Sequence, residues 1–277
     1  MANTVVQTKS TTAQPASSAA PTLAFASNNT SGNALIVTVA VQTQTVTGVS
    51  DSHGQTYTLD KSGTGGGWNL YIYRFFNCRG GACTVTVNLS AATANVKITI
   101  TELAATAGMV FWGVDVTGSL TGTGTAVSCG PFTTTKPNDV IIATSMNSGP
   151  QTTTVGSGYT TLGAQWTAGN PDEYQILTAT GSQTPSATLA ASATWGMIAV
   201  AYAAQTPTDS GSLTATEATS TPASAPFIGV NSGALTALEN SSSPPSHPTV
   251  TGTAPLPPVS QAQNQDGWPG EFSSGGW

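Results

Sequence analysis

Charge is scarce in this chain of 277 residues. Only 6% of the residues are Asp, Glu, Lys or Arg, with 6 basic side chains against 12 acidic ones and a formal net charge of -6, whereas charged residues make up about 25% of an average soluble domain. Long surface helices need such residues on their solvated faces, so the composition excludes a helix-rich protein. Binding to nucleic-acid phosphates requires a basic patch, so nucleic acid is not an expected partner.

Long apolar runs are also lacking, and cysteines are few. The longest apolar runs, such as Ala34 to Val41, fall far short of the roughly 20 residues that a membrane-spanning helix needs, so no membrane partner is expected. The first residues, MANTVVQTKS, do not resemble a secretory signal, which leaves a mature form or another route out of the cell. Three cysteines are too few for a disulfide-dependent fold.

The residues that are abundant favour strands and turns. Thr, Val and Gly suit strands and the turns between them, and apolar side chains alternate in Thr84 to Leu89 and again at Val96, Ile98 and Ile100. Clusters of turn residues recur about every 8 to 12 residues, a spacing typical of a β-sandwich. The sequence therefore predicts an all-β, antiparallel β-sandwich without a cofactor.

The composition divides the chain into three parts. Residues 205–277 hold 10 of the 17 prolines and no Lys or Arg, so we expect a Pro-, Ser- and Thr-rich acidic arm that is disordered when free in solution. Residues 1–21 are polar and are expected to form an N-terminal arm or an edge strand. The sandwich itself is expected over residues 22–204.

An internal repeat is the most informative pattern. GNALIVTVAV from Gly32 matches PNDVIIATSM from Pro137, and the order of the later segments is kept, with offsets from 105 (Asn33 to Asn138) down to about 100 (Ile98 to Ile198). We interpret residues 32–104 and 137–204 as two pseudo-repeats of a four- or five-stranded unit.

No catalytic constellation emerges from the polar residues. Asp51, Ser52 and His53 are consecutive, but a catalytic triad converges from separate segments, so a turn is the better interpretation. Asp172 and Glu173 are the only adjacent carboxylates. They offer ligands for calcium, although a solvated loop before a strand fits them better because no regular ladder of acidic ligands surrounds them. No catalytic or metal-binding residue is assigned.

Cys78 and Cys83 flank a four-residue segment. In a hairpin with a loop of that length the two would face each other within disulfide reach, so a disulfide and two free thiols remain open alternatives. Zinc is not expected, because no further Cys and no His lie at ligand spacing. Cys129, beside Gly130 and Pro131, fits a buried small apolar side chain.

Aromatic side chains offer a second kind of candidate site. Aromatic rings stack on the apolar faces of sugars, and Trp68 and Trp166 lie near Gly-rich turns, so these two are the candidate glycan-facing residues. Trp195 and Tyr71 lie inside alternating strand patterns and are expected in the sandwich core.

Several of these segments together resemble a known module. GNALIVTVAV, then VTGVSDSHGQTYTL, an aromatic strand, a Gly-Gly turn and CTVTVNLS resemble a β-sandwich module of tailed-phage virion proteins and of bacterial surface or secreted proteins, over about residues 22–204. The module usually has a hydrophobic residue in the place of His53. The resemblance implies a jelly-roll-like fold and carries no catalytic residues.

The function implied is structural. We expect a non-enzymatic virion protein, such as a phage capsid decoration, head-fibre or tail-associated subunit, in the extracellular particle. Its expected partners are copies of itself (a trimer, by analogy with decoration proteins), other virion proteins such as the major capsid protein, and a host-surface glycan. Trp268, Phe272 and Trp277 are the expected assembly anchors of the C-terminal arm, because aromatic residues often dominate interface energy. The alternative is a carbohydrate-binding or adhesin module that is secreted or displayed on a bacterial surface.

Overall fold

The computed structural model describes residues 2–11, 15–149, 151–163, 170 and 172–206. Within this part the chain contains sixteen strands and no helix, which confirms the predicted all-β class, and no helix there could cross a membrane. The first eight strands are β1 (Thr4–Ser10), β2 (Thr22–Ala24), β3 (Ala34–Gln42), β4 (Val46–Asp51), β5 (Thr58–Gly65), β6 (Trp68–Phe75), β7 (Thr84–Leu89) and β8 (Val96–Ala104). The others are β9 (Val110–Ser128), β10 (Phe132–Thr134), β11 (Val140–Asn147), β12 (Thr153–Val155), β13 (Thr160–Leu162), β14 (Asp172–Ile176), β15 (Gly181–Gln183) and β16 (Ser186–Gln205).

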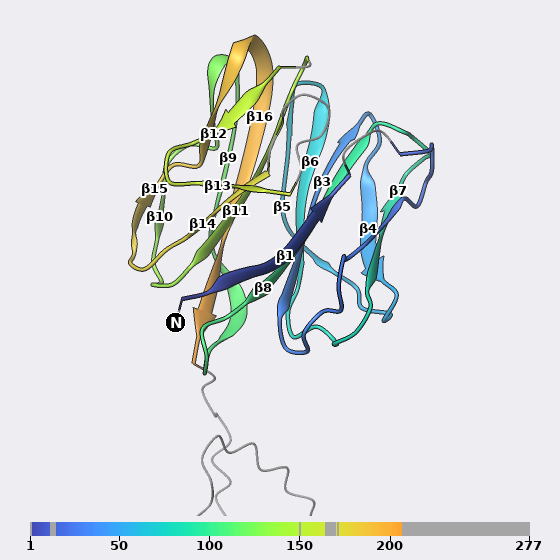
Figure 1. Cartoon of the computed structure of the whole chain (residues 1–277). Coiled ribbons are helices and arrows are strands. Elements are labelled where there is room, and N and C mark those ends of the chain that lie inside the picture. The colour runs from blue at the N-terminus through green and yellow to red at the C-terminus, as the bar shows by residue number, and fades with distance from the viewer. Residues whose placement is uncertain (1, 12–14, 150, 164–169, 171, 207–277) are drawn as a thin grey trace, which may run out of the picture. The chain divides into compact units, whose positions relative to one another are not determined.

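The strands form four sheets that lie in layers (Figure 1). The first main sheet has the order β1-β8-β3-β6-β5, and the second main sheet has the order β12-β16-β11-β14-β13, with β9 also paired to β16. An outer sheet, β2-β7-β4, lies beside the first main sheet, and a small sheet, β10-β15, lies at the opposite side of the layers (Figure 1). All of these pairings are antiparallel.

Three apolar cores hold the layers together. The first outer core lies between the outer sheet and the first main sheet and contains Val37, Ile98 and Val87. The inner core lies between the two main sheets and includes Ile36 and Ile142. The second outer core lies on the far face of the second main sheet and contains Trp195, Met197, Ala199, Phe132 and Leu189. Because both faces of each main sheet are covered, β3, β8 and β11 are buried almost throughout. In β8 the buried side chains include Lys97 and Glu102 as well as the apolar ones.

The first main sheet begins before residue 22, where the sequence predicts the start of the sandwich. Thr4–Ser10 pairs with β8 as the edge strand of the first main sheet. Of the two predictions for the N-terminal segment, an arm or an edge strand, these residues form the edge strand. The last strand ends at Gln205. Residues 207–277, with the expected anchors Trp268, Phe272 and Trp277, lie outside the described residues.

The strand order bears on the predicted repeat. The paths β8-β3-β6-β5 and β16-β11-β14-β13 follow the same order relative to the chain. The predicted match of Ile98 with Ile198 does not place these residues at equivalent positions, because Ile98 packs in the first outer core whereas Ile198 packs in the inner core. A slip of one residue moves a side chain to the other face of its sheet. The pseudo-repeats and the jelly-roll topology thus stay predictions.

Candidate functional site

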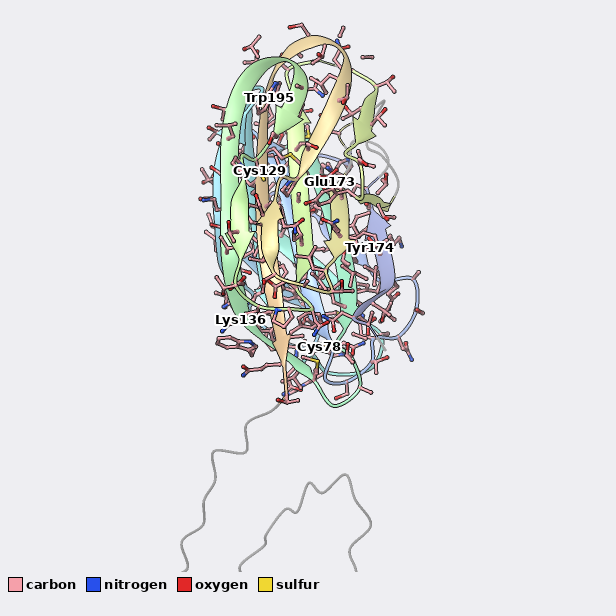
Figure 2. The ribbon with its side chains drawn as sticks, turned by 90° about the vertical axis from the view of Figure 1, so that its left-hand side faces the viewer. Cys78, Cys129, Lys136, Glu173, Tyr174 and Trp195 are labelled. Atoms are coloured by element: carbon pink, nitrogen blue, oxygen red, sulfur yellow. The ribbon has the colours of Figure 1, made fainter. Side chains whose placement is uncertain are left out.

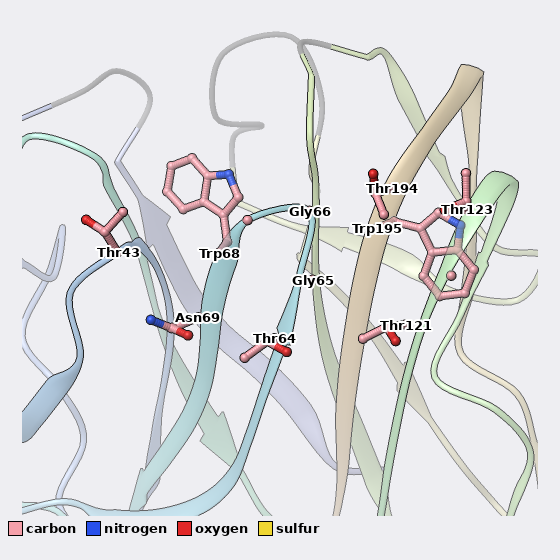
Figure 3. A pocket seen from close by; sticks show the side chains of 12 residues that line it. Thr43, Thr64, Gly65, Gly66, Trp68, Asn69, Thr121, Thr123, Thr194 and Trp195 are labelled. Carbon is pink, nitrogen blue, oxygen red and sulfur yellow. The ribbon is translucent and has the colours of Figure 1, made fainter.

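An open groove of about 580 Å³ lies where the first half of the chain meets the second. Figure 3 shows its two sides, the turn between β5 and β6 on one and the strands β9 and β16 on the other. The lining residues are Thr43, Thr64, Gly65, Gly66, Gly67, Trp68, Asn69, Thr121, Gly122, Thr123, Thr194 and Trp195.

The first side is a tight hairpin. Gly65 pairs with Trp68, which leaves Gly66 and Gly67 as a two-residue loop with φ of 60° and 81°. Two positive φ angles are what the favoured hairpin turn requires, and glycine adopts them without strain. Gly65 also lies against Gly196 of β16, so closely that a methyl group on either residue would overlap the backbone of the other. The glycines therefore let the hairpin of the first half contact the second main sheet directly.

The second side is built around Trp195. This residue pairs with Gly122, and a side chain at Gly122 would overlap the indole ring, so the glycine makes room for the ring on β9. Trp195 is 6% exposed, and its Nε1 is buried without a hydrogen-bond partner in the described part of the chain. A buried N–H group without a partner is destabilising.

The chemistry of the lining is polar and uncharged. Five threonines line the groove together with two tryptophans, four glycines and Asn69, and none of the twelve residues is charged. The Asn69 amide already donates to the backbone oxygen of Gln44 at 2.8 Å. Aromatic rings flanked by hydroxyl groups suit a neutral ligand that has apolar faces and many hydroxyls. The same lining contains no acid, base or thiol that could act on such a ligand.

The aromatic candidates are distributed differently from the sequence interpretation. Trp68 lies in the groove, half-buried, and Trp166 lies outside the described residues. Trp195, expected in the core, packs in the second outer core and also lines the groove. Sequence reasoning missed this dual position and the contribution of Thr121 and Thr123. The glycines at positions 122 and 196 were the available signal, because they permit close approach of backbone and ring.

Asp51 caps a turn, as the sequence interpretation expected. Its Oδ1 accepts hydrogen bonds from the backbone N–H groups of His53 at 2.9 Å and Gln55 at 3.1 Å. Its Oδ2 accepts one from the Tyr57 hydroxyl at 3.2 Å. Asp51, Ser52 and His53 do not form a catalytic triad.

Asp172 and Glu173 contradict the interpretation as a solvated loop. They begin β14, and both are buried. Asp172 accepts hydrogen bonds from Lys97 Nζ at 2.7 Å and Thr38 Oγ1 at 2.8 Å, across the inner core. Their partners come from other strands, so the two-residue sequence could not indicate that the carboxylates would be buried.

Glu173 points to the other face of the same strand. Its carboxylate accepts the backbone N–H groups of Gly156 at 3.3 Å and Ser186 at 3.1 Å. Burial raises the pKa of Glu173 to about 7, although those two hydrogen bonds act to lower the pKa. The side chain lies among the strands of the second half (Figure 2).

The three cysteines are free, buried thiols. The hairpin expected around Cys78 and Cys83 is wrong, because β6 belongs to the first main sheet and β7 to the outer sheet, so the segment between them crosses from one layer to the next. The Cys78 thiol donates to the backbone oxygen of Thr30 at 3.2 Å, and the Cys83 thiol faces Asp51 Oδ2 at 3.7 Å. Of the two alternatives left open by the sequence, the structure has the free thiols. Burial raises the pKa of Cys78 to about 11 and that of Cys83 to about 12.

Comparisons with known proteins add no relative. No family model, no curated protein and no solved structure matches this chain.

Proposed function

We propose that this chain is a non-enzymatic structural protein of a phage particle, a capsid decoration, head-fibre or tail-associated subunit that assembles with copies of itself. The observation that carries the proposal is the set of exposed apolar side chains on the edge strand β9. Of the five large apolar side chains that are exposed in the described part of the chain, three belong to this strand, namely Val110, Trp112 and Leu120. Trp112 is 48% exposed, and solvent-facing tryptophan is typical of protein interfaces.

The backbone of β9 is also available. Among the described strands it pairs only with β16, so one edge of a 19-residue strand has no strand partner. A long edge of this kind is a template for pairing with a further chain. Strand addition combined with an exposed aromatic anchor is a common mode of assembly.

The occupant that we propose is the C-terminal arm of a neighbouring copy. Gln205, where the last described strand ends, pairs with Val110, so that strand ends beside the part of β9 that carries Trp112. The sequence continues for 71 residues beyond the described part, from 207 to 277. An arm with Trp268, Phe272 and Trp277 gains contact area by lying on the same surface of the next copy.

Light scattering of the purified protein tests this assembly. The full chain is expected to form a defined oligomer, while a chain that ends at Gln205 and the Trp112→Ser variant are expected to be monomers. Leu59→Ser is the matched control, because Leu59 is 45% exposed but lies on β5, and it should retain the oligomer. A monomeric full chain at micromolar concentration contradicts the proposal.

The groove supports a second candidate function, the binding of a glycan. The specific observation is the pair Trp68 and Trp195 across an uncharged, threonine-rich groove. Such a site serves a virion protein that touches a host-surface glycan, and it serves equally an adhesin that is secreted or displayed on a bacterial surface.

Titration calorimetry with soluble cello-, xylo- and chito-oligosaccharides tests the groove. Trp68→Ala is expected to weaken binding by up to about tenfold, which corresponds to the loss of one stacking contact of about 1.4 kcal/mol. Trp112→Ala is the control and should bind like the unmodified chain, since Trp112 is not part of the lining. If no oligosaccharide binds, or if both variants lose binding equally, the groove is not the glycan site.

A further inference from the structure

The turn after β4 and the start of β7 bring together three different metal-ligating side chains. One ligand atom each from Asp51, His53 and Cys83 lies within 4.8 Å of the other two. The pairing of β4 with β7 causes this approach: Asp51 pairs with Val85, and the backbone N–H of Ser52 donates to the backbone oxygen of Thr84 at 2.9 Å. Cys83 therefore lies beside the turn that contains His53, although about thirty positions separate them in the sequence.

We propose that Asp51, His53 and Cys83 form a zinc-binding site. A carboxylate oxygen, an imidazole nitrogen and a thiolate are the three kinds of ligand that zinc takes in proteins. Zinc–ligand bonds of about 2.0–2.3 Å place tetrahedral ligand atoms roughly 3–4 Å apart. The Cys83 sulfur already lies 3.7 Å from Asp51 Oδ2, and the ligand atom of His53 lies within 4.8 Å of both residues' ligand atoms.

The carboxylate is oriented before any metal arrives. The backbone N–H groups of His53 and Gln55 hold Oδ1 of Asp51. Tyr57 donates its hydroxyl hydrogen to Oδ2, the atom that faces Cys83. Hydrogen bonds to a ligating carboxylate fix its direction and increase metal affinity.

His53 supplies an independent sign that the cluster accepts a ligand. Its Nδ1 atom is buried and has no hydrogen-bond partner within the described residues. A buried polar atom without a partner is destabilising, and coordination to a cation satisfies it. When the metal binds, the Cys83 thiol releases its proton to solvent and the sulfur becomes a thiolate ligand.

The full chain, reduced and freed of metal with a chelator, is the material for the test. Cobalt(II) serves as the spectroscopic probe for zinc. We expect one equivalent to produce a thiolate-to-cobalt charge-transfer band in the near ultraviolet together with visible bands of a tetrahedral complex, and we expect zinc to displace them. Cys83→Ser should abolish the charge-transfer band, and His53→Ala should weaken cobalt binding by at least about tenfold.

Cys129→Ser is the matched control. Cys129 is also a buried free thiol but lies far from Cys78 and the first outer core (Figure 2), so its replacement should leave the spectrum unchanged. Circular dichroism checks that Cys83→Ser folds. If that variant does not fold, His53→Ala replaces it in the test, because His53 lies on a partly exposed turn.

Two results overturn the proposal. One is that the reduced, unmodified chain gives no charge-transfer band with cobalt(II), whether or not Cys78 and Cys83 formed a disulfide before reduction. The other is a charge-transfer band that survives in Cys83→Ser. The oligomeric state and the glycan titrations are separate measurements, so this site can fail while the proposed function stands, and the reverse.

Discussion

Each main sheet buries one glutamate completely, and the two glutamates behave in opposite ways. Glu102 on β8 and Glu173 on β14 are both 0% exposed. Burial alone would raise the pKa of Glu102, but its hydrogen bonds outweigh burial and hold the pKa below the usual range. Burial raises the pKa of Glu173 to about 7. The degree of burial by itself therefore does not decide whether the pKa of a glutamate is raised or lowered.

The number and kind of donors make the difference. Glu102 accepts four hydrogen bonds of 2.6–2.8 Å, from the side chains of Gln7, Asn29 and Asn33 and from the backbone N–H of Thr30. Glu173 accepts two longer ones from backbone N–H groups. Hydrogen bonds donated to a carboxylate favour its ionised form. The short polar segment before β3 therefore keeps Glu102 ionised, although the two are far apart in the sequence.

The largest expected effect concerns Asp172, the sequence neighbour of Glu173. Asp172→Ala leaves the Lys97 ammonium, 2% exposed, without its carboxylate in the inner core, and we expect a loss of about 3–5 kcal/mol of unfolding free energy. Urea denaturation measures it. The paired replacement Lys97→Met with Asp172→Leu should recover most of the loss, and a double variant as unstable as Asp172→Ala would contradict this account.

Glu102→Gln is expected to cost about 1.5–3 kcal/mol at pH 7. The replacement removes the charge that four donors share and places an N–H group among them. Because the pKa of Glu102 is lowered in the folded state, its contribution is present above the ordinary glutamate range and is lost as the pH falls through the lower, folded-state pKa. The difference between the two proteins should thus shrink in acid, which denaturation curves at pH 7 and pH 3 can show.

Glu173 should affect stability with the opposite dependence on pH. Its raised pKa means that the stability it contributes is present below about pH 4.5 and is lost as the pH rises through about 7. Asp139, which faces Asp115 and has a pKa raised to about 7 by burial and by that neighbour, acts in the same direction. We expect the unmodified chain to be more stable at pH 5 than at pH 8.

Glu173→Gln with Asp139→Asn should flatten that dependence. Both replacements are neutral at every pH, so neither side chain has to lose a proton in a buried site. If the free energy of unfolding of the unmodified chain rises between pH 5 and pH 8, burial does not raise the pKa values of Glu173 and Asp139.

Local patterns predicted much of the architecture. Alternating Thr and Val in Thr84 to Leu89 indicated a strand with one apolar face, and the buried positions of β7 alternate accordingly. The change in composition near position 205 lies within one residue of the end of β16. The glycine pair at positions 66 and 67 marked a turn. Each of these properties depends on residues that are close together in the sequence.

The candidate sites were predicted less well, because they depend on pairings between distant strands. The short segment from Cys78 to Cys83 resembled a hairpin, but its flanking strands joined different sheets. Trp195 fitted a core strand, and only the approach of the β5–β6 turn placed it in a groove as well.

The sequence by itself determined that this protein is built from strands and where several of its turns lie, because strand alternation and turn preferences are local. Only the tertiary structure decided which face of a sheet Ile98 and Ile198 occupy, which donors surround Glu102 and Glu173, and that His53 meets Cys83. A shift of one residue in strand register exchanges the two faces of a sheet. Contacts between layers are thus fixed by register and by the packing of all sheets together, which no single segment of the sequence specifies.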